Sequence, residues 1–179
     1  MVICFTWLYN GKQGAVVADI ATANNEKGRM LTLEGSKVIG IGQVIGFVEN
    51  MHGEKVFFIT DSFLFSIGAM PLSTGAYKIE TAHENIPILE DYLSGIGMGV
   101  DISAFFSWSG SIGYSIYEVN YEEETYERPS FVYSGYKTDL SLGISFGNTT
   151  VYGKDQNGIN KLLALGVSQN MIDRLLRDF

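Results

Sequence analysis

The residues of this chain that could perform acid–base, nucleophilic or metal chemistry are few and widely separated. Neither His52 nor His83 has a second histidine or cysteine at metal-ligand spacing. The possible ligands close to them in the sequence are the carboxylates Glu54 and Glu84. The single cysteine, Cys4, lies in an apolar run without a neighbouring base or cation, which predicts a buried structural thiol. The sequence therefore predicts no metal and no cofactor.

An enzyme of unfamiliar type remains one hypothesis. It would have to bring together residues that the sequence keeps far apart, and their proximity cannot be derived from the sequence. The residues available for such a site are Asp19, Lys37, His52, Asp61, His83 and Glu84.

Residues 37–61 resemble a dinucleotide-binding unit, in which a strand, a glycine-rich turn and a helix precede an acidic residue. The glycines are Gly40, Gly42 and Gly46, and the acid is Asp61. Gly46 comes one residue late for this pattern, and the space for the helix is short and filled with residues that favour strands. A β-hairpin is therefore the preferred interpretation.

Residues 143–147, GISFG, match the nucleophile elbow of the α/β-hydrolases, with Ser145 at its centre. Residues 148–152 read as a continuing strand, however, and both histidines precede Ser145. A strand face made of glycine and serine produces the same match, so no hydrolase site is predicted here.

The first forty residues loosely resemble the proteasome-type N-terminal-nucleophile hydrolases through Thr6, Asp19 and Lys37. The resemblance implies a hydrolase in which an N-terminal threonine attacks with the support of an aspartate and a lysine. Removal of Met1 would expose Val2, which has no nucleophilic side chain, so this activity would require cleavage before Thr6.

Length and charge restrict the class of protein. A chain of 179 residues with 46% hydrophobic residues predicts one domain, 1–179, with a sizeable core. The formal net charge of −8 argues against a nucleic-acid partner, because no basic stripe is present. The N-terminus lacks the pattern of a signal peptide and no apolar run is long enough for a membrane-spanning helix. We expect a cytoplasmic protein, or one exported without a cleaved signal peptide.

Alternating residues give the clearest structural signal. In residues 102–117 and 140–147, apolar residues alternate with serine and glycine, which predicts strands with one apolar face and one small polar face. We expect two long strands, about 100–121 and 131–151, joined by an exposed acidic loop at 122–129. Four shorter hairpins are predicted before them, with turns near 10–14, 34–36, 50–54 and 71–75.

Three helices complete the prediction. One is expected near the middle, at 84–93, and two at the C-terminus, at 158–165 and 168–179, with Ser168 as an N-cap and Gly166 as a stop signal. Residues 162–175 also look like a helix-turn-helix, but a helical pair of about 156–179 packed on the sheet is preferred. The predicted fold is α+β and mainly antiparallel, a twisted sheet or a partial β-barrel or sandwich.

The function that this pattern favours is a non-catalytic, soluble interaction or assembly protein that binds another protein or itself. The Ser/Gly face, Trp108 on the opposite face and the acidic loop are its predicted contacts: Ser107, Trp108, Ser109, Ser111, Glu122, Glu123, Glu124 and Tyr126. The alternative is a membrane-inserting protein of the pore-forming or toxin-like kind, in which residues 100–151 form an amphipathic hairpin with its apolar face toward lipid.

Overall fold

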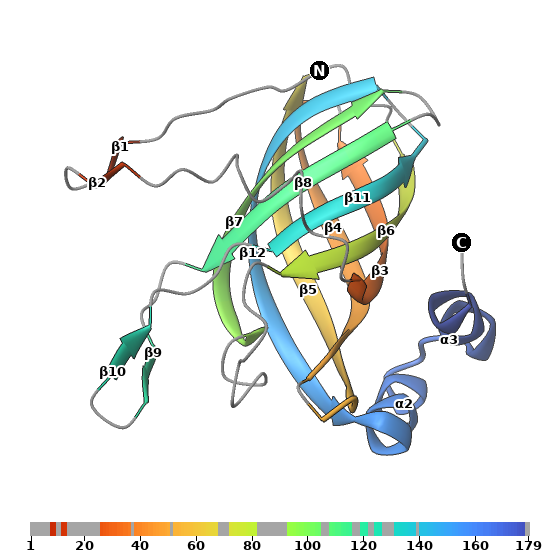
Figure 1. Cartoon of the computed structure of the whole chain (residues 1–179). Helices are drawn as coiled ribbons and strands as arrows, with labels where there is room; N and C mark the ends of the chain where they lie inside the picture. The colour runs from red at the N-terminus through yellow and green to blue at the C-terminus, as the bar shows by residue number, and fades with distance from the viewer. Residues whose placement is uncertain are drawn as a thin grey trace.

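The computed structural model is dominated by antiparallel strands (Figure 1). The structure describes residues 8–9, 12–13, 26–36, 38–50, 52–67, 72–81, 93–104, 108–115, 119–121, 124–126, 131–138 and 140–177.

Eight of the strands form one sheet. They are β3 (Glu26–Ser36), β4 (Ile39–Glu49), β5 (Lys55–Ile67), β6 (Ser73–Thr81), β7 (Gly95–Ala104), β8 (Trp108–Ser115), β11 (Phe131–Lys137) and β12 (Leu140–Lys154). Their order is β11-β6-β3-β4-β5-β12-β7-β8, and β11 also pairs with β8, so the sheet closes into a barrel. Two small hairpins, β1 (Leu8–Tyr9) with β2 (Lys12–Gln13) and β9 (Val119–Tyr121) with β10 (Glu124–Tyr126), form separate sheets.

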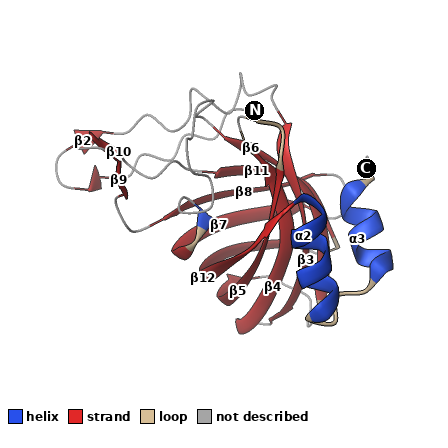
Figure 2. Ribbon diagram, turned by 90° about the horizontal axis from the view of Figure 1, so that it is seen from below, coloured by secondary structure: helices blue, strands red, loops and turns tan. Residues whose placement is uncertain are grey.

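The barrel has two distinguishable ends. At the first, which we call the turn end, β3 connects to β4, β5 to β6, β7 to β8 and β11 to β12. At the second, the helix end, β4 turns into β5, and β12 leads into helix α2 (Asp155–Ala164), which is followed by α3 (Gln169–Leu176). Both helices lie against the outside of the barrel, α2 next to β12 and β5 and α3 next to β3 (Figure 2).

Local signals account for the helical pair. The Ser168 side chain accepts a hydrogen bond of 3.3 Å from the backbone N–H of Met171, which is the expected N-cap interaction. Gly166 has φ 91°, a left-handed conformation that favours glycine and ends the preceding helix. The two C-terminal helices, their N-cap and their stop signal are therefore confirmed.

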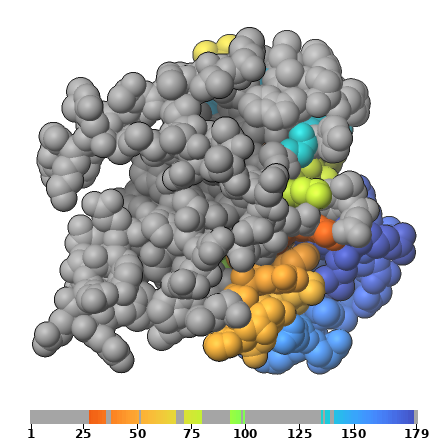
Figure 3. Space-filling view, viewed as in Figure 1, coloured from red at the N-terminus to blue at the C-terminus, as the bar shows by residue number. Residues whose placement is uncertain are grey.

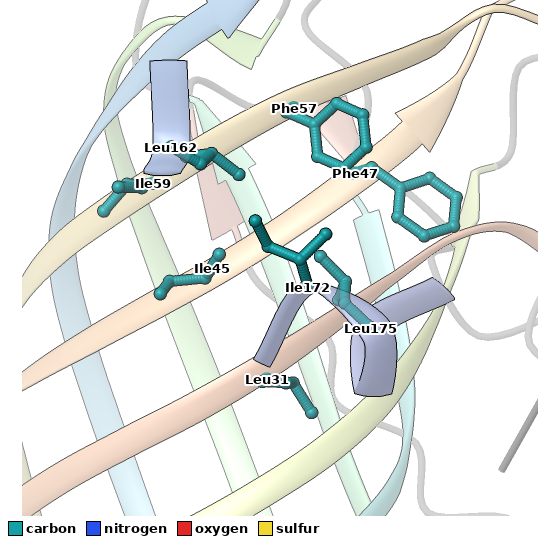
Figure 4. Close-up of a cluster of buried hydrophobic side chains, with 8 residues drawn as sticks. All are labelled: Leu31, Ile45, Phe47, Phe57, Ile59, Leu162, Ile172 and Leu175. Atoms are coloured by element: carbon teal, nitrogen blue, oxygen red, sulfur yellow. The ribbon is translucent and has the colours of Figure 1, made fainter. Parts of the chain in front are cut away.

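Two apolar clusters hold the structure together, one on each side of the sheet. The first lies inside the barrel toward the helix end and is made of Met30, Val48, Val56, Phe58, Tyr77, Ile79 and Leu93. The second lies between the outer wall and the helices and is made of Leu31, Ile45, Phe47, Phe57, Ile59, Leu162, Ile172 and Leu175 (Figure 4). In the space-filling view the blue helices lie directly against the orange β4–β5 segment (Figure 3).

The expected mainly antiparallel α+β class is confirmed, but the two predicted long strands are wrong. Residues 100–121 contain the end of β7 and all of β8, which pair with each other, and residues 131–151 contain β11 and most of β12, which do not pair. Ala104 is the cross-strand partner of Trp108, so the alternation keeps its phase through the intervening turn and conceals it in the sequence. The predicted helix at 84–93 lies outside the described residues except for Leu93.

Two of the predicted turns are displaced. Strand β3 continues through Glu34 to Ser36, so the β3–β4 connection comes after the expected turn at 34–36, and Lys12 and Gln13 form β2 rather than part of a turn. Glu34 lies in the strand, paired in register with Gly42 and Ser73, and its carboxylate forms an ion pair with Lys137 inside the barrel. The hairpin turn at 50–54, by contrast, lies where the sequence predicts it.

Candidate functional site

The outer wall of the barrel carries a bare apolar surface toward the turn end. Exposed residues on it include Phe63, with 59% of its surface accessible, and Ile67, with 76%. We call this surface the apolar belt. Its described members come from four neighbouring strands and are Leu33, Ile39, Ile41, Phe63, Phe65, Ile67, Leu142, Ile144 and Phe146.

The register shows that the belt is continuous from strand to strand. Phe65 is the cross-strand partner of both Ile39 and Ile144, and Phe63 is the partner of both Ile41 and Phe146. Directly opposed residues in a sheet lie on the same face, with their Cβ atoms about 5 Å apart. The belt therefore wraps around the curved wall across β4, β5 and β12 instead of forming one flat patch.

On β4, β5 and β12, a row of polar residues separates the belt from the helices, whereas on β3 Leu33 of the belt is followed on the same face by Leu31 of the helix-covered cluster. Gln43, Asp61 and Asn148 are cross-strand neighbours on β4, β5 and β12, and the amide Nε2 of Gln43 donates a hydrogen bond of 2.9 Å to Asp61 Oδ1. On the other side of this polar row, Ile45 and Ile59 are buried beneath the helical pair. The chain thus covers one apolar part of its outer wall with α2 and α3 and leaves the other part bare.

The inside of the barrel at the turn end is mainly polar, with Leu64 as a buried apolar residue among Ser62 and Ser66 on the inner face of β5. The Lys137 ammonium lies 2.7 Å from the carboxylate of Glu34, and the two side chains are only 1% and 15% exposed. Lys137 also donates a hydrogen bond of 3.4 Å to the Ser141 hydroxyl. The described buried polar residues are Thr32, Ser66, Ser73, Lys137 and Ser141, and each lies on the inward face of its strand.

Small residues make this polar interior compact. The Ser62 hydroxyl donates to the carbonyl of Gly42 at 3.1 Å, and the hydroxyls of Thr60 and Thr149 are 2.7 Å apart. A Cβ atom added to Gly42 would lie only 3.1 Å from Glu34 Cγ and 3.0 Å from Ser62 Oγ, so glycine lets the inner side chains approach.

A second polar cluster, at the helix end, is the turn between β4 and β5. The Asn50 amide donates 2.7 Å to Glu54 Oε2, and the Lys154 ammonium donates 3.1 Å to the same oxygen. These two contacts, the Asn50 hydrogen bond first, lower the pKa of the Glu54 carboxyl. Together with the bond of 3.0 Å from Lys55 N to Asp155 Oδ1, the cluster fixes where α2 begins.

Of the residues predicted as interaction sites, the structure gives the strand positions of five. Trp108, Ser109 and Ser111 lie on β8, and Glu124 and Tyr126 lie on β10. Ser107, Glu122 and Glu123 lie outside the described residues, and the predicted contacts stay predictions. In the related segment 140–147, the small face is turned inward, with Ser141 buried, and the apolar face is outside.

The candidate catalytic residues that the structure describes do not come together. His52 is exposed in the turn at 50–54, whereas Asp61 lies along β5 and bonds Gln43. Ser145 lies in the middle of β12 and not at a strand-to-helix turn, and Gly40, Gly42 and Gly46 lie within β4. The remaining candidates, Cys4, Thr6, Asp19, Lys37, His83 and Glu84, lie outside the described residues.

Among the residues whose positions are described, no three His, Cys, Asp or Glu side chains gather in a way that could hold a metal ion. No helix within these residues has the length and apolar content that crossing a bilayer demands. No protein-family model, curated protein or solved structure matches this chain.

Sequence reasoning missed the belt on β4 and β5. The signal was present, because Ile39 and Ile41 alternate with glycines, and Phe63, Phe65 and Ile67 alternate with other residues in the same way. It was hidden because the same strands continue into segments that are apolar on both faces, such as 55–59, where both clusters of the core meet.

Proposed function

We propose that this is a non-catalytic membrane-binding protein, in which the apolar belt contacts the hydrocarbon of a lipid bilayer. The observation that carries the proposal is the inverted distribution of side chains at the turn end. There the described wall is apolar outside and mainly polar inside, where Lys137 and Glu34 form a buried ion pair and Leu64 is a buried apolar exception. Water outside the belt would make this arrangement unfavourable, whereas lipid matches the outer face.

The helix end of the same barrel provides the comparison. There the interior is filled by apolar side chains, including Phe58 and Ile79, and the outer wall is covered by α2 and α3. This is the ordinary arrangement of a domain surrounded by water. One barrel thus has two ends built for two different surroundings.

The shape of the belt supports lipid over a protein partner. A flat protein surface could contact only one side of a convex wall, but the belt extends over β3, β4, β5 and β12 and carries no charged residue among its described members. The apolar cluster inside the barrel at the helix end fills the interior with side chains such as Met30 and Phe58. A filled interior supports membrane anchoring rather than a pore along the barrel axis.

Flotation of the purified protein with phosphatidylcholine vesicles tests this proposal. Zwitterionic lipid is chosen because the net charge of −8 would oppose binding to anionic lipid. We expect the protein to float, and Phe65→Arg to weaken its partitioning by about 2–4 kcal/mol, the cost of a cation on a lipid-facing position near mid-depth. Asn170→Arg, on the exposed part of α3, adds the same charge away from the belt and should float like the parent.

Two results would overturn the proposal. One is flotation of Phe65→Arg as strong as that of Asn170→Arg. The other is failure of the parent protein to float while light scattering gives a defined dimer mass, since a second copy would then cover the belt. The latter result would favour the self-associating, soluble protein that the sequence pattern also supports.

A further inference from the structure

Resting on the proposed membrane function, we infer that the protein enters only one leaflet of the bilayer, turn end first. In this arrangement the polar row of Gln43, Asp61 and Asn148 lies at the level of the lipid headgroups. Helices α2 and α3 remain outside the hydrocarbon.

The height of the belt is the first argument. Strand β5 rises about 20 Å between Asp61 and Ile67 at roughly 3.3 Å per residue. A strand tilt of about 40° reduces this rise to about 15 Å along the barrel axis. The hydrocarbon core of a bilayer is about 30 Å thick, so the belt matches about one leaflet.

The exposed residues at the tips of the strands are the second argument. Val38 and Leu72, which flank connections at the turn end, are exposed, as is Ile67 at the end of β5. A barrel that crossed the whole bilayer would place these residues in the water beyond the far leaflet. Insertion into one leaflet leaves them in hydrocarbon, where apolar side chains are favoured.

Two of the four connecting segments at the turn end are uncharged, which agrees with this orientation. The residues between Ile67 and Leu72, GAMP, and those between β7 and β8, FFS, contain no charged residue. Lys37 and Asp139, in the other two connections of the turn end, are charged, so this orientation carries the cost of placing two opposite charges at the depth of the strand tips. At the opposite end, the segment between β8 and β11 (116–130) contains five glutamates, which favour water strongly over lipid.

The polar row is the third argument. Asp61 is a carboxylate on the outer wall, and Gln43 and Asn148 flank it in register. Charged and amide groups are costly in hydrocarbon and are accommodated near the headgroups. A position deeper than the headgroups would bury Asp61 in lipid, so the row sets the greatest depth to which the protein can enter.

Depth-dependent fluorescence quenching tests this inference. In a Cys4→Ser background, single cysteines at Leu72, Ile144 and Asn148 are labelled with an environment-sensitive fluorophore and bound to phosphatidylcholine vesicles. The lipids carry bromine either near the end of the acyl chain or near the headgroup. We expect a deep-to-shallow quenching ratio well above one for Leu72→Cys, an intermediate ratio for Ile144→Cys, and a ratio below one for Asn148→Cys.

A membrane-impermeant thiol reagent, trapped inside the vesicles, separates insertion into one leaflet from crossing. With the unlabelled Leu72→Cys variant, one-leaflet insertion predicts no reaction with either the trapped or an external reagent. Reaction of Leu72→Cys with the trapped reagent would overturn this inference while leaving membrane binding intact. Failure of the parent protein to float would instead remove the proposed function itself, so the two failures are distinguishable.

Discussion

The ion pair inside the barrel provides the sharpest test of the side-chain arrangement. Lys137→Met removes the ammonium that lies 2.7 Å from Glu34 and leaves the carboxylate in an interior where it is only 15% exposed. Removal of one partner from a buried pair usually costs 3–5 kcal/mol, because the remaining charge has lost its compensation. We therefore expect the free energy of unfolding to fall by about 3–5 kcal/mol.

The matched control is the same substitution in an exposed pair. Lys55 Nζ lies 3.1 Å from Glu49 Oε1, and these side chains are 37% and 41% exposed. Pairs of this kind contribute about 0–1 kcal/mol, so Lys55→Met should have a small effect. Urea unfolding of both variants under identical solvent conditions measures the difference. Equal losses in the two variants would refute the reasoning that the turn end has a polar, water-poor interior.

A double substitution separates the loss of the pair from the loss of space-filling atoms. Glu34→Gln combined with Lys137→Met removes both charges and keeps most of the side-chain volume. We expect this variant to recover much of the stability lost in Lys137→Met, because no uncompensated charge remains inside the barrel. If the double variant is no more stable than the single one, the ion pair is not the reason for the loss.

Three further predictions concern other parts of the fold. Leu175→Ala should lower stability by about 2–5 kcal/mol, because Leu175 is fully buried between α3 and the wall; urea unfolding checks this, and a loss below 1 kcal/mol would contradict the packing. Thr32→Val should leave stability unchanged or raise it by about 1 kcal/mol, because the buried hydroxyl has no hydrogen-bond partner among the described residues; a clear loss in thermal unfolding would contradict this. The pKa of Glu54 should lie below that of an ordinary glutamate and return toward it in Asn50→Ala, which an NMR titration measures. Since the folded-state pKa is the lower one, the stability from Glu54 is present above about pH 4.3 and is lost as the pH falls through the folded value; an unchanged pKa in Asn50→Ala would refute the assignment.

The parts of the fold that could be predicted from sequence are those in which residues a few positions apart determine where a helix or a turn begins and ends. Ser168 and Gly166 set the limits of the C-terminal helices through capping and a left-handed residue, and both signals act within a few residues. The hairpin turn at 50–54 is another such case, because Asn50 bonds the backbone of His52 and Glu54 and closes the turn locally.

The remaining parts depend on contacts between distant residues. Glu34 and Lys137 are far apart in sequence, and nothing near Glu34 indicates that its partner lies on β11. Glu34 is paired in register with Gly42 on β4 and Ser73 on β6, so it lies in a strand where the sequence suggests a turn. The predicted long strands failed for a related reason, because a turn that preserves the phase of alternation cannot be recognised from alternation alone.

The alternation of apolar and small polar residues also leaves one question open, namely which face is outside. In a barrel surrounded by water the apolar face would point inward, and the sequence of β12 is compatible with either choice. The structure places Ser141 inside and Leu142, Ile144 and Phe146 outside, while the same strand has Thr149 inside and reaches the α2-covered region beyond it. Strand β5 carries the contrast between the two ends, with Ser62 and Ser66 on its inner face at the turn end and Val56 and Phe58 on the same face at the helix end. This contrast is the feature from which both the membrane function and the one-leaflet depth are inferred.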